Sequence, residues 1–283
     1  MLKKVFKYDI YGNMKLFSML YLIVGVLFII SLVLNQVNKL IPEDIQAIGL
    51  TNFVCGLSMF LMYFSCMLLV GASSLLCAVL FYKSVATNEG YLTHTLPVTK
   101  KTLVLGKSLA GLVYCFISLI IGFACAAIHT AVVFPDTFNS LLRNLKDSFY
   151  IATHSDEFTP LLVISVIIFI LAFVAQVFFN INLYYCCVSF GQINNSHKII
   201  MSIVAYIVYT MVIQFLSGLI SFGFSLAISI NPERLQNFQA YMDAHPDLIM
   251  LIISLVVLLF NIGFSALAIH ISSKTLEKKL NLQ

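Results

Sequence analysis

Six long stretches of this chain contain neither a charged residue nor a proline, and this pattern constrains the fold more than any other feature. Each approaches or exceeds the ~20 residues that an α-helix needs to cross a hydrocarbon layer about 30 Å thick. A helix satisfies its own backbone hydrogen bonds, which hydrocarbon cannot do. The sequence therefore predicts six membrane-spanning helices, at about residues 16–34, 52–82, 108–134, 161–190, 199–230 and 248–273.

The composition excludes a water-soluble fold. Of the 283 residues, 60% are hydrophobic and 10% are charged, whereas soluble domains contain about a quarter of charged residues. An interior proline would break a helix in a place where lipid cannot replace the lost hydrogen bond. All six prolines fall between the predicted spans: Pro42, Pro97, Pro135, Pro160, Pro232 and Pro246. We therefore expect an all-α integral membrane protein, a single transmembrane domain over residues 1–283.

The basic residues predict the orientation of the spans. With the N-terminus inside, twelve of the 16 Lys and Arg residues lie in cytoplasmic segments. The other four are Lys39, Arg143, Lys146 and Arg234. Short cytoplasmic loops carry an excess of basic residues, so this distribution predicts that both ends of the chain lie in the cytoplasm.

Three further segments are expected to lie along a membrane surface. Residues 2–11 (LKKVFKYDIY) form a short basic amphipathic stretch, which we interpret as an interfacial helix on the cytoplasmic side. On the outer side, helical spacing connects Phe138, Leu141, Leu142, Leu145 and Phe149. A second outer helix is expected to begin with Asn231 as its cap and Pro232 at its first position, and to continue along an apolar stripe of Leu235, Phe238 and Met242.

The predicted cytoplasmic connection between spans two and three is polar. A short helix can run up to the residue before Pro97, because the residue before a proline disfavours helical geometry. Thr99 is placed to cap the next span, with Lys100 and Lys101 at the level of the lipid headgroups. An ordered connection of this kind could receive a soluble partner, although the composition fits a plain solvated loop equally well.

This connection also resembles a known loop. The stretch Glu89-Gly90-Tyr91-Leu92-Thr93-His94-Thr95-Leu96-Pro97-Val98-Thr99, followed by Gly106-Lys107-Ser108-Leu109, is similar to the first cytoplasmic loop of bacterial ABC transporter permeases of the ABC-2 class. In that family an acid-glycine start, a T-L-P-V-[ST] core and a lysine opening the third span recur. The layout of a basic N-terminal helix, six spans and short outer helices is also similar.

The resemblance implies a function for the whole chain. It implies the permease subunit of an exporter in the bacterial plasma membrane, without an ATPase of its own. Two cytoplasmic ATPase subunits would bind ATP and Mg, and a second permease, identical or homologous, would complete the complex. The chain itself would bind no cofactor and no nucleic acid, and membrane lipid would surround it. The loop would act as a coupling helix, with Glu89, Gly90, Tyr91, Leu92, Thr93, His94, Leu96 and Pro97 as the residues that contact the ATPase.

One motif could be mistaken for a nucleotide site. Gly106-Lys107-Ser108 resembles the end of a phosphate-binding loop, but that motif requires a glycine at position 101, where this chain has Lys101. The start of a helix with a lysine that extends toward the interface explains the triplet.

The spans contain few groups that could carry out chemistry. They contain no Asp, Glu, Lys or Arg, so an ion-coupled carrier lacks its usual residues. The seven cysteines form no CxxC or Cys/His cluster, and we predict no catalytic residue and no metal site. The alternative is an intramembrane enzyme or a non-transporting assembly factor. Against an enzyme, the chain has no HExxH motif, and no span has a histidine near its middle.

The most central polar side chains are Gln214 and Asn261, in spans five and six. Such residues can form a hydrogen bond between helices, or they can line a substrate path. A cargo would be hydrophobic or amphipathic, such as a peptide, a drug or a lipid-like molecule.

Overall fold

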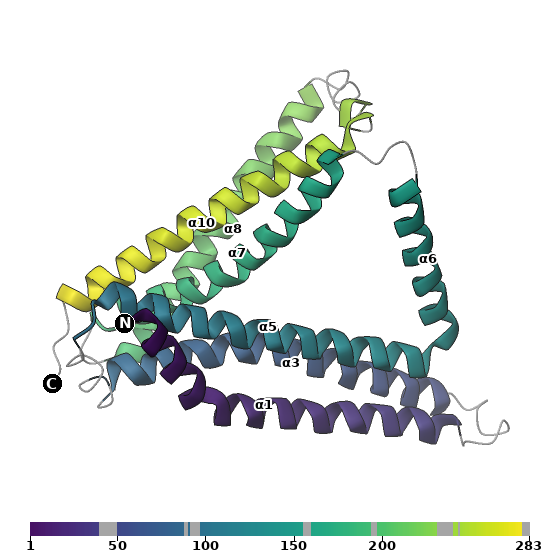
Figure 1. Ribbon diagram of the computed structural model, residues 1–283, viewed down its shortest axis with the longest axis horizontal. Coiled ribbons are helices and arrows are strands. Elements are labelled where there is room, and N and C mark those ends of the chain that lie inside the picture. The colour runs from purple at the N-terminus through teal and green to yellow at the C-terminus, as the bar shows by residue number, and fades with distance from the viewer. Residues whose placement is uncertain are drawn as a thin grey trace. The chain divides into compact units, whose positions relative to one another are not determined.

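The computed structural model of the chain describes residues 1–39, 50–87, 90, 97–154, 160–193, 197–230, 240–242 and 244–278. Within these ranges the protein is helical apart from short turns, and it contains no strand. The helices are α1 (Leu2–Lys39), α3 (Leu50–Ala86), α5 (Lys100–Val133), α6 (Pro135–His154), α7 (Pro160–Gly191), α8 (Lys198–Ile230) and α10 (Pro246–Lys278) (Figure 1).

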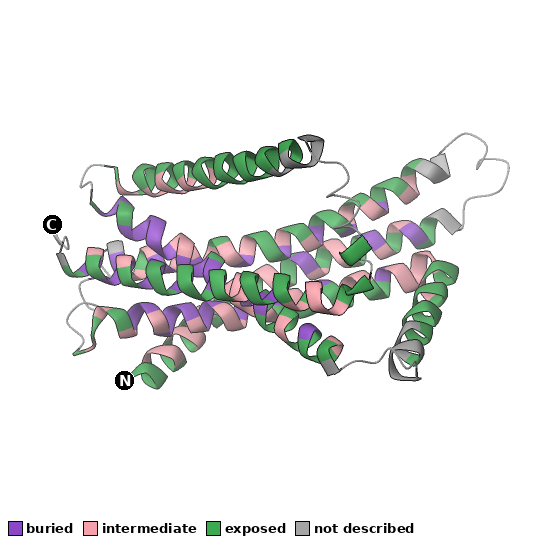
Figure 2. Cartoon of the chain, turned by 90° about the horizontal axis from the view of Figure 1, so that it is seen from above, coloured by how far each residue is buried: buried purple, intermediate pink, exposed green. Residues whose placement is uncertain are grey.

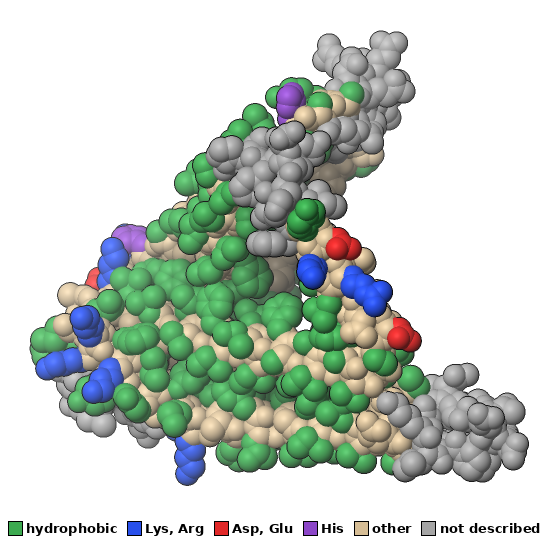
Figure 3. All heavy atoms as spheres, turned by 45° about the vertical axis from the view of Figure 1, so that its right-hand side comes forward, with side chains coloured by type: hydrophobic (Ala, Val, Ile, Leu, Met, Phe, Trp, Pro, Cys, Tyr) green, Lys and Arg blue, Asp and Glu red, His purple; other side chains and the backbone are tan. Residues whose placement is uncertain are grey.

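Six of these helices, all except α6, are long and apolar enough to cross a membrane. Each contains the core of one predicted span, so the chain is a multi-pass, all-helical membrane protein. Their exposed surfaces are apolar, as expected for surfaces that face lipid. On the face drawn in Figure 3, hydrophobic side chains cover the lengths of the helices, and charged side chains lie toward the helix ends and on α6.

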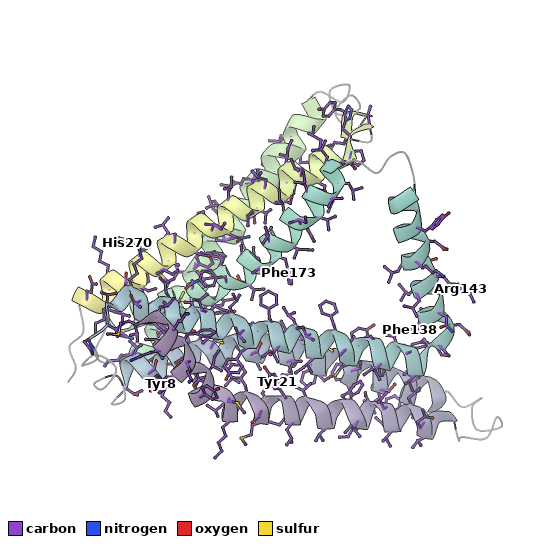
Figure 4. All side chains as sticks on the ribbon, viewed as in Figure 1. Tyr8, Tyr21, Phe138, Arg143, Phe173 and His270 are labelled. Atoms are coloured by element: carbon purple, nitrogen blue, oxygen red, sulfur yellow. The ribbon has the colours of Figure 1, made fainter. Side chains whose placement is uncertain are left out.

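The N-terminal segment differs from the prediction. Residues 2–11 are not a separate helix, because α1 runs without interruption from Leu2 to Lys39. No proline or strong breaker separates the basic segment from the apolar span, so the backbone hydrogen bonds continue through residues 12–15. The helix instead bends between the part that carries Tyr8 and the part that carries Tyr21 (Figures 1 and 4).

Helix α6 occupies the segment of the first predicted outer helix. Helix α6 follows directly after α5, with Pro135 at its first position and Asp136 in its first turn, an arrangement that suits a helix N-terminus. Its Leu141, Leu142 and Leu145 side chains are exposed. Of the predicted helix that begins at Asn231, residues 231–239 lie outside the described residues.

The chain divides into two compact units, and the boundary cuts through α3 and α5. Unit 1 contains Met1–Leu80 and Leu109–Ser155, and unit 2 contains Phe81–Ser108 and Asp156–Gln283. The two ends that flank the connection between α3 and α5 therefore belong to unit 2, together with α7, α8 and α10.

In unit 1, α5 packs against α1 through aromatic rings. Phe17 stacks on Tyr114 with ring centroids 3.8 Å apart. The Tyr114 hydroxyl donates a hydrogen bond to the Ile10 carbonyl, and the Tyr21 hydroxyl donates to the Tyr114 carbonyl at 3.3 Å. The buried residues Phe17, Val24 and Ser31 of α1 recur every seven positions, as in a coiled-coil seam.

Helices α3 and α5 of unit 1 pack at small residues. The Cys66 thiol lies 3.6 Å from the Gly122 carbonyl oxygen, and the Cys77 thiol lies 3.9 Å from the Gly111 carbonyl oxygen. Small residues allow membrane helices to approach closely, and both contacts are made by cysteine thiols at glycine carbonyls.

In unit 2, α7 is the central helix and packs against both α8 and α10. Its buried residues Ser165, Ala172, Phe179 and Cys186 recur every seven positions. The buried residues of α10 on this side are Ser254, Asn261 and Ala268, which are also seven positions apart. The Phe179 ring meets the Phe264 ring edge-on at 6.2 Å. The seam between α7 and α10 is therefore regular and formed largely by small side chains.

Helix α8 contacts α7 over only part of its length. Its half-buried positions end at Thr210, and every side chain from residue 211 to residue 223 is exposed. Figure 2 shows that exposed residues predominate along parts of the helices and that buried residues are few there.

Where α7 ends and α8 begins, Gly191 closes the joint between the two helices. A Cβ atom at position 191 would overlap the Ser202 hydroxyl and the Lys198 carbonyl, and it would lie 2.9 Å from the Ser202 backbone nitrogen. Two of these obstacles are backbone atoms, which cannot rotate away. The approach of the two helices therefore requires glycine at this position.

Replacement of Gly191 by alanine is expected to destabilise the folded protein, because overpacking costs about 1–3 kcal/mol. The measurement is thermal unfolding of the purified protein in detergent, with Gly191→Ala giving a lower midpoint than the wild type. Gly218→Ala in α8 is the matched control, since nothing lies within 4 Å of its added Cβ. Equal midpoints for the two variants would contradict this description of the joint.

Candidate functional site

The connection between α3 and α5 carries the predicted coupling residues, of which the structure describes two. Gly90 and Pro97 lie within the described residues. The other six lie outside them: Glu89, Tyr91, Leu92, Thr93, His94 and Leu96. The described part of the site therefore consists of these two residues and the ends of α3 and α5 that flank the connection.

Gly90 is held tightly against the end of α3. The residue is buried, and its backbone N–H donates a hydrogen bond of 2.8 Å to the Thr87 carbonyl. A Cβ atom at this position would lie 2.5 Å from the Val85 carbonyl oxygen. Glycine is therefore required here by the close approach of two backbone segments.

Thr99 caps α5, as the sequence predicts. Its Oγ1 accepts a hydrogen bond from the Thr102 backbone N–H at 3.3 Å, and the two threonine hydroxyls lie 2.7 Å apart. A side-chain oxygen that accepts from the third helical N–H is the usual N-cap arrangement. The cap starts α5 at Lys100, eight residues before the predicted beginning of the third span.

This early start changes the interpretation of Gly106-Lys107-Ser108. The triplet lies inside α5 and not at its beginning, so the helix-start explanation of Lys107 is wrong, and no loop exists there to surround a phosphate. Lys107 is 8% exposed. The predicted cap at Thr99 is confirmed, and a helix that begins there continues through Lys107.

Both flanks of the connection are anchored to α7 by one cluster of buried side chains. The Phe81 ring of α3 stacks on the Tyr185 ring of α7 with centroids 4.0 Å apart and planes at 8°. The Tyr185 hydroxyl donates to the Lys107 carbonyl of α5 at 3.3 Å. One tyrosine of α7 therefore contacts the last turns of α3 and the first turns of α5. Each of these residues belongs to unit 2.

A second contact reinforces this anchor. The Ser108 hydroxyl of α5 lies 2.6 Å from Oδ1 of Asn182 in α7, and Asn182 Nδ2 donates to the Phe178 carbonyl at 2.8 Å. Both side chains are completely buried. A buried amide needs partners of this kind, because an unpaired polar group away from water costs free energy. The anchor therefore consists of Phe81, Lys107, Ser108, Asn182 and Tyr185.

Sequence reasoning missed most of this anchor. The polar residue Asn182 within an apolar stretch was a usable signal, because such residues mark contacts between membrane helices. Tyr185 gave no signal, since aromatic residues are frequent in this chain, with 13 tyrosines and 24 phenylalanines.

The two predicted substrate-path residues lie in different environments. Gln214 is exposed on α8. Asn261 is buried on α10, and within the described part of the chain neither its Nδ2 nor the buried hydroxyl of Ser265, one turn away, has a hydrogen-bond partner. Helices α8 and α10 both pack against α7, and among the described residues no hydrogen bond joins Gln214 to the Asn261 Nδ2 atom.

The helix register nevertheless places them at one level. Tyr184 of α7 contacts Tyr206 of α8, with centroids 5.3 Å apart. Eight residues farther along each helix lie Gln176 and Gln214, and both helices rise 1.5 Å per residue. On the other side of α7, Phe179 contacts Phe264, and Gln176 and Asn261 each precede these rings by three residues. Gln176, Gln214 and Asn261 therefore lie at about the same level, near the middle of the three helices.

Comparison of the chain with protein-family models, with curated proteins and with solved structures finds no match. The class that the fold itself defines is a multi-pass membrane protein with six helices of spanning length.

The contact between Ser108 and Asn182 is expected to stabilise the protein, and a double-mutant cycle measures it. We expect Ser108→Ala and Asn182→Leu to show a coupling of about 0.6 kcal/mol, and at most about 1.7 kcal/mol, in unfolding from mixed micelles, which are the average and the maximum for hydrogen bonds between membrane helices. Ser108→Ala combined with Ser74→Ala is the control, because the Ser74 hydroxyl bonds only within α3, to the Gly71 carbonyl. Additive effects in both cycles would show that the contact contributes nothing.

Proposed function

We propose that this chain is the transmembrane permease subunit of an ATP-binding-cassette exporter of the ABC-2 type. The complex would lie in the bacterial plasma membrane and would move a hydrophobic or amphipathic cargo. Two copies of a separate ATPase would bind ATP and Mg in the cytoplasm. A second permease, identical or homologous, would complete the membrane part.

One observation carries the proposal: the connection that resembles the ABC-2 loop is attached at both ends to α7. Phe81 before it and Lys107 after it both contact Tyr185. A loop that receives mechanical work must be connected rigidly to the elements that move. This anchor supplies such a connection, which a plain solvated loop would not need.

The proposal implies an order of events. ATP binding would close the two ATPase subunits and push Glu89, Gly90, Tyr91, Leu92, Thr93, His94, Leu96 and Pro97 of each permease. The force would pass through Tyr185 and Asn182 to α7, and through the α7–α10 seam to α10. Rigid helices that shift against each other change which side of a membrane protein is open.

The proposed orientation gives each surface segment a side of the membrane. With both ends in the cytoplasm, α6 would lie outside, where its exposed leucines would rest on the outer leaflet. The first residues of α1, which include Lys3, Lys4 and Lys7, would lie at the cytoplasmic surface.

Loss of the coupling contacts is expected to separate the ATPase from the permease without unfolding the permease. The change is Glu89→Ala together with Leu92→Ala, and the measurements are co-purification with the ATPase and ATP-driven transport. Removal of important interface side chains costs about 2 kcal/mol, or about thirty-fold in affinity. Ser74→Ala is the control variant. If assembly and transport persist unchanged in the double variant, the coupling assignment is wrong.

The orientation gives a separate prediction. In a cysteine-free background, a cysteine at His94 is expected to react with a membrane-impermeant thiol reagent only after the cytoplasmic side is opened. A cysteine at Arg143 of α6 is the matched control and is expected to react in intact cells. Reaction of the cysteine at position 94 in intact cells would overturn the orientation and the coupling role together.

A further inference from the structure

Residues 3–15 of α1 carry their exposed side chains on one side of the helix. At about 100° of rotation per residue, Lys4, Lys7, Tyr8, Tyr11 and Lys15 fall within an arc of about 100°. All five side chains are exposed, Tyr8 to 75% and Tyr11 to 67%. We call these five residues the lysine-tyrosine stripe.

The opposite side of this segment faces the protein. Phe6, Ile10 and Asn13 are half-buried there, and the Tyr114 hydroxyl of α5 donates a hydrogen bond to the Ile10 carbonyl. Asp9, the one acid among residues 1–17, is also half-buried and lies on this side. The segment therefore turns its acid and much of its apolar surface inward, and it presents lysine and tyrosine outward.

The stripe lies at the edge of a span. Lys15 directly precedes the apolar stretch 16–34, within a helix that is long and apolar enough to cross a membrane. Helix α1 bends between the part that carries Tyr8 and the part that carries Tyr21 (Figure 4), so the stripe need not continue in the direction of the span. The stripe is therefore next to lipid headgroups, whichever side of the membrane the N-terminus occupies.

The chemistry of the stripe matches an anionic lipid surface. Each lysine offers a positive charge and three N–H donors, and each tyrosine offers a hydroxyl. Lysines beside a span attract anionic lipids, and tyrosine is enriched at the interface between membrane and water. Lys7 Nζ lies 5.9 Å from the centroid of the Tyr11 ring, a cation–π distance that brings the two kinds of side chain together.

The length of the stripe favours a surface over a single small anion. Eleven residues separate Lys4 from Lys15, which corresponds to about 16 Å along the helix. One phosphate group cannot reach both lysines, whereas a row of neighbouring headgroups can. The continuity of the stripe with the span places such a row beside it.

We propose that the lysine-tyrosine stripe binds the phosphate groups of anionic phospholipids in the adjacent leaflet. This inference goes beyond the proposed transport function and does not depend on it, because it requires only that α1 crosses a membrane. The bound lipids would hold the first part of α1 at the membrane surface. Through the contact between Ile10 and Tyr114, they would also be connected to α5.

The experiment measures which lipids remain bound to the purified protein. The protein in an uncharged detergent is mixed with equal amounts of phosphatidylglycerol and phosphatidylcholine that carry the same acyl chains, and native mass spectrometry counts each bound lipid. One lysine near an anionic surface contributes about five-fold in affinity. We therefore expect the wild type to bind phosphatidylglycerol at least five-fold more than phosphatidylcholine. Equal binding of the two lipids would overturn the proposal.

Matched changes of charge locate the binding. Lys4→Gln with Lys15→Gln removes two charges from the stripe and is expected to abolish most of the preference for phosphatidylglycerol. Arg143→Gln with Lys146→Gln removes two exposed charges from α6 and is expected to leave the preference as in the wild type. An equal loss in both variants would indicate a response to total charge and would overturn the proposal.

A charge-conserving variant separates lipid binding from folding. Lys4→Arg with Lys15→Arg keeps both positive charges and is expected to keep the preference for phosphatidylglycerol. A loss of preference in this variant as large as in the glutamine variant would contradict a role for the charges.

Two other occupants would also overturn the proposal, and each has its own measurement. If the stripe binds a soluble phosphate compound, excess glycerol phosphate displaces phosphatidylglycerol, whereas we expect no displacement of a lipid that its acyl chains also hold. If the stripe binds an acidic surface of a soluble protein such as the proposed ATPase, Lys4→Gln with Lys15→Gln abolishes co-purification and leaves the lipid preference unchanged. We expect the opposite result, a lost lipid preference with co-purification retained.

Discussion

The absence of water inside a bilayer determines most of what this chain can be. Every backbone N–H and C=O group in the hydrocarbon layer must find its partner within the chain, so the spanning segments become long, uninterrupted helices. Because lipid is as apolar as leucine, burial of leucine does not hold such helices together. The contacts between helices are accordingly made by small residues, stacked rings and polar side chains, as at Gly122, Tyr114 and Asn182.

These contacts are distributed unequally in unit 2. At the end that carries the connection to α3 and α5, Tyr185, Asn182 and Ser108 combine ring stacking with buried hydrogen bonds. Toward the middle of the helices, the polar groups are exposed, as Gln214 is, or buried without a partner, as Asn261 is. The rigid attachment therefore lies at the connection that is proposed to contact the ATPase. The polar side chains Gln214 and Asn261 lie farther along the helices, at the level of the predicted substrate path.

The positions of the spans could be predicted from the sequence, because hydropathy and chain length determine them directly. The ends could not be predicted as well. The apolar stretch predicts a third span from residue 108, whereas the helix begins at Lys100, at the cap that Thr99 was expected to form. The continuity of α1 was missed because a change in composition near Gly12 does not require a break in the helix.

The candidate site illustrates the same limit. Gly90 belonged to the predicted coupling set, although its close approach to Val85 depends on a backbone path that no pattern encodes. Gln214 and Asn261 were recognised as central polar residues, but their common level with Gln176 depends on the contacts of Tyr184 with Tyr206 and of Phe179 with Phe264. This register is determined by contacts between helices that are far apart in the sequence, and it cannot be predicted from composition.

The joint at Gly191 gives α8 the geometry of a lever. One end is fixed where Gly191 leaves no room between Lys198 and Ser202, and the side chains from 211 to 223 make no buried contact. Twenty residues of helix follow Thr210, a length of about 30 Å. A rotation of about 10° about Thr210, where the half-buried positions end, displaces the free end by about 5 Å, which is about the width of an extended polypeptide chain. A small movement at the base is thus converted into an opening of molecular size.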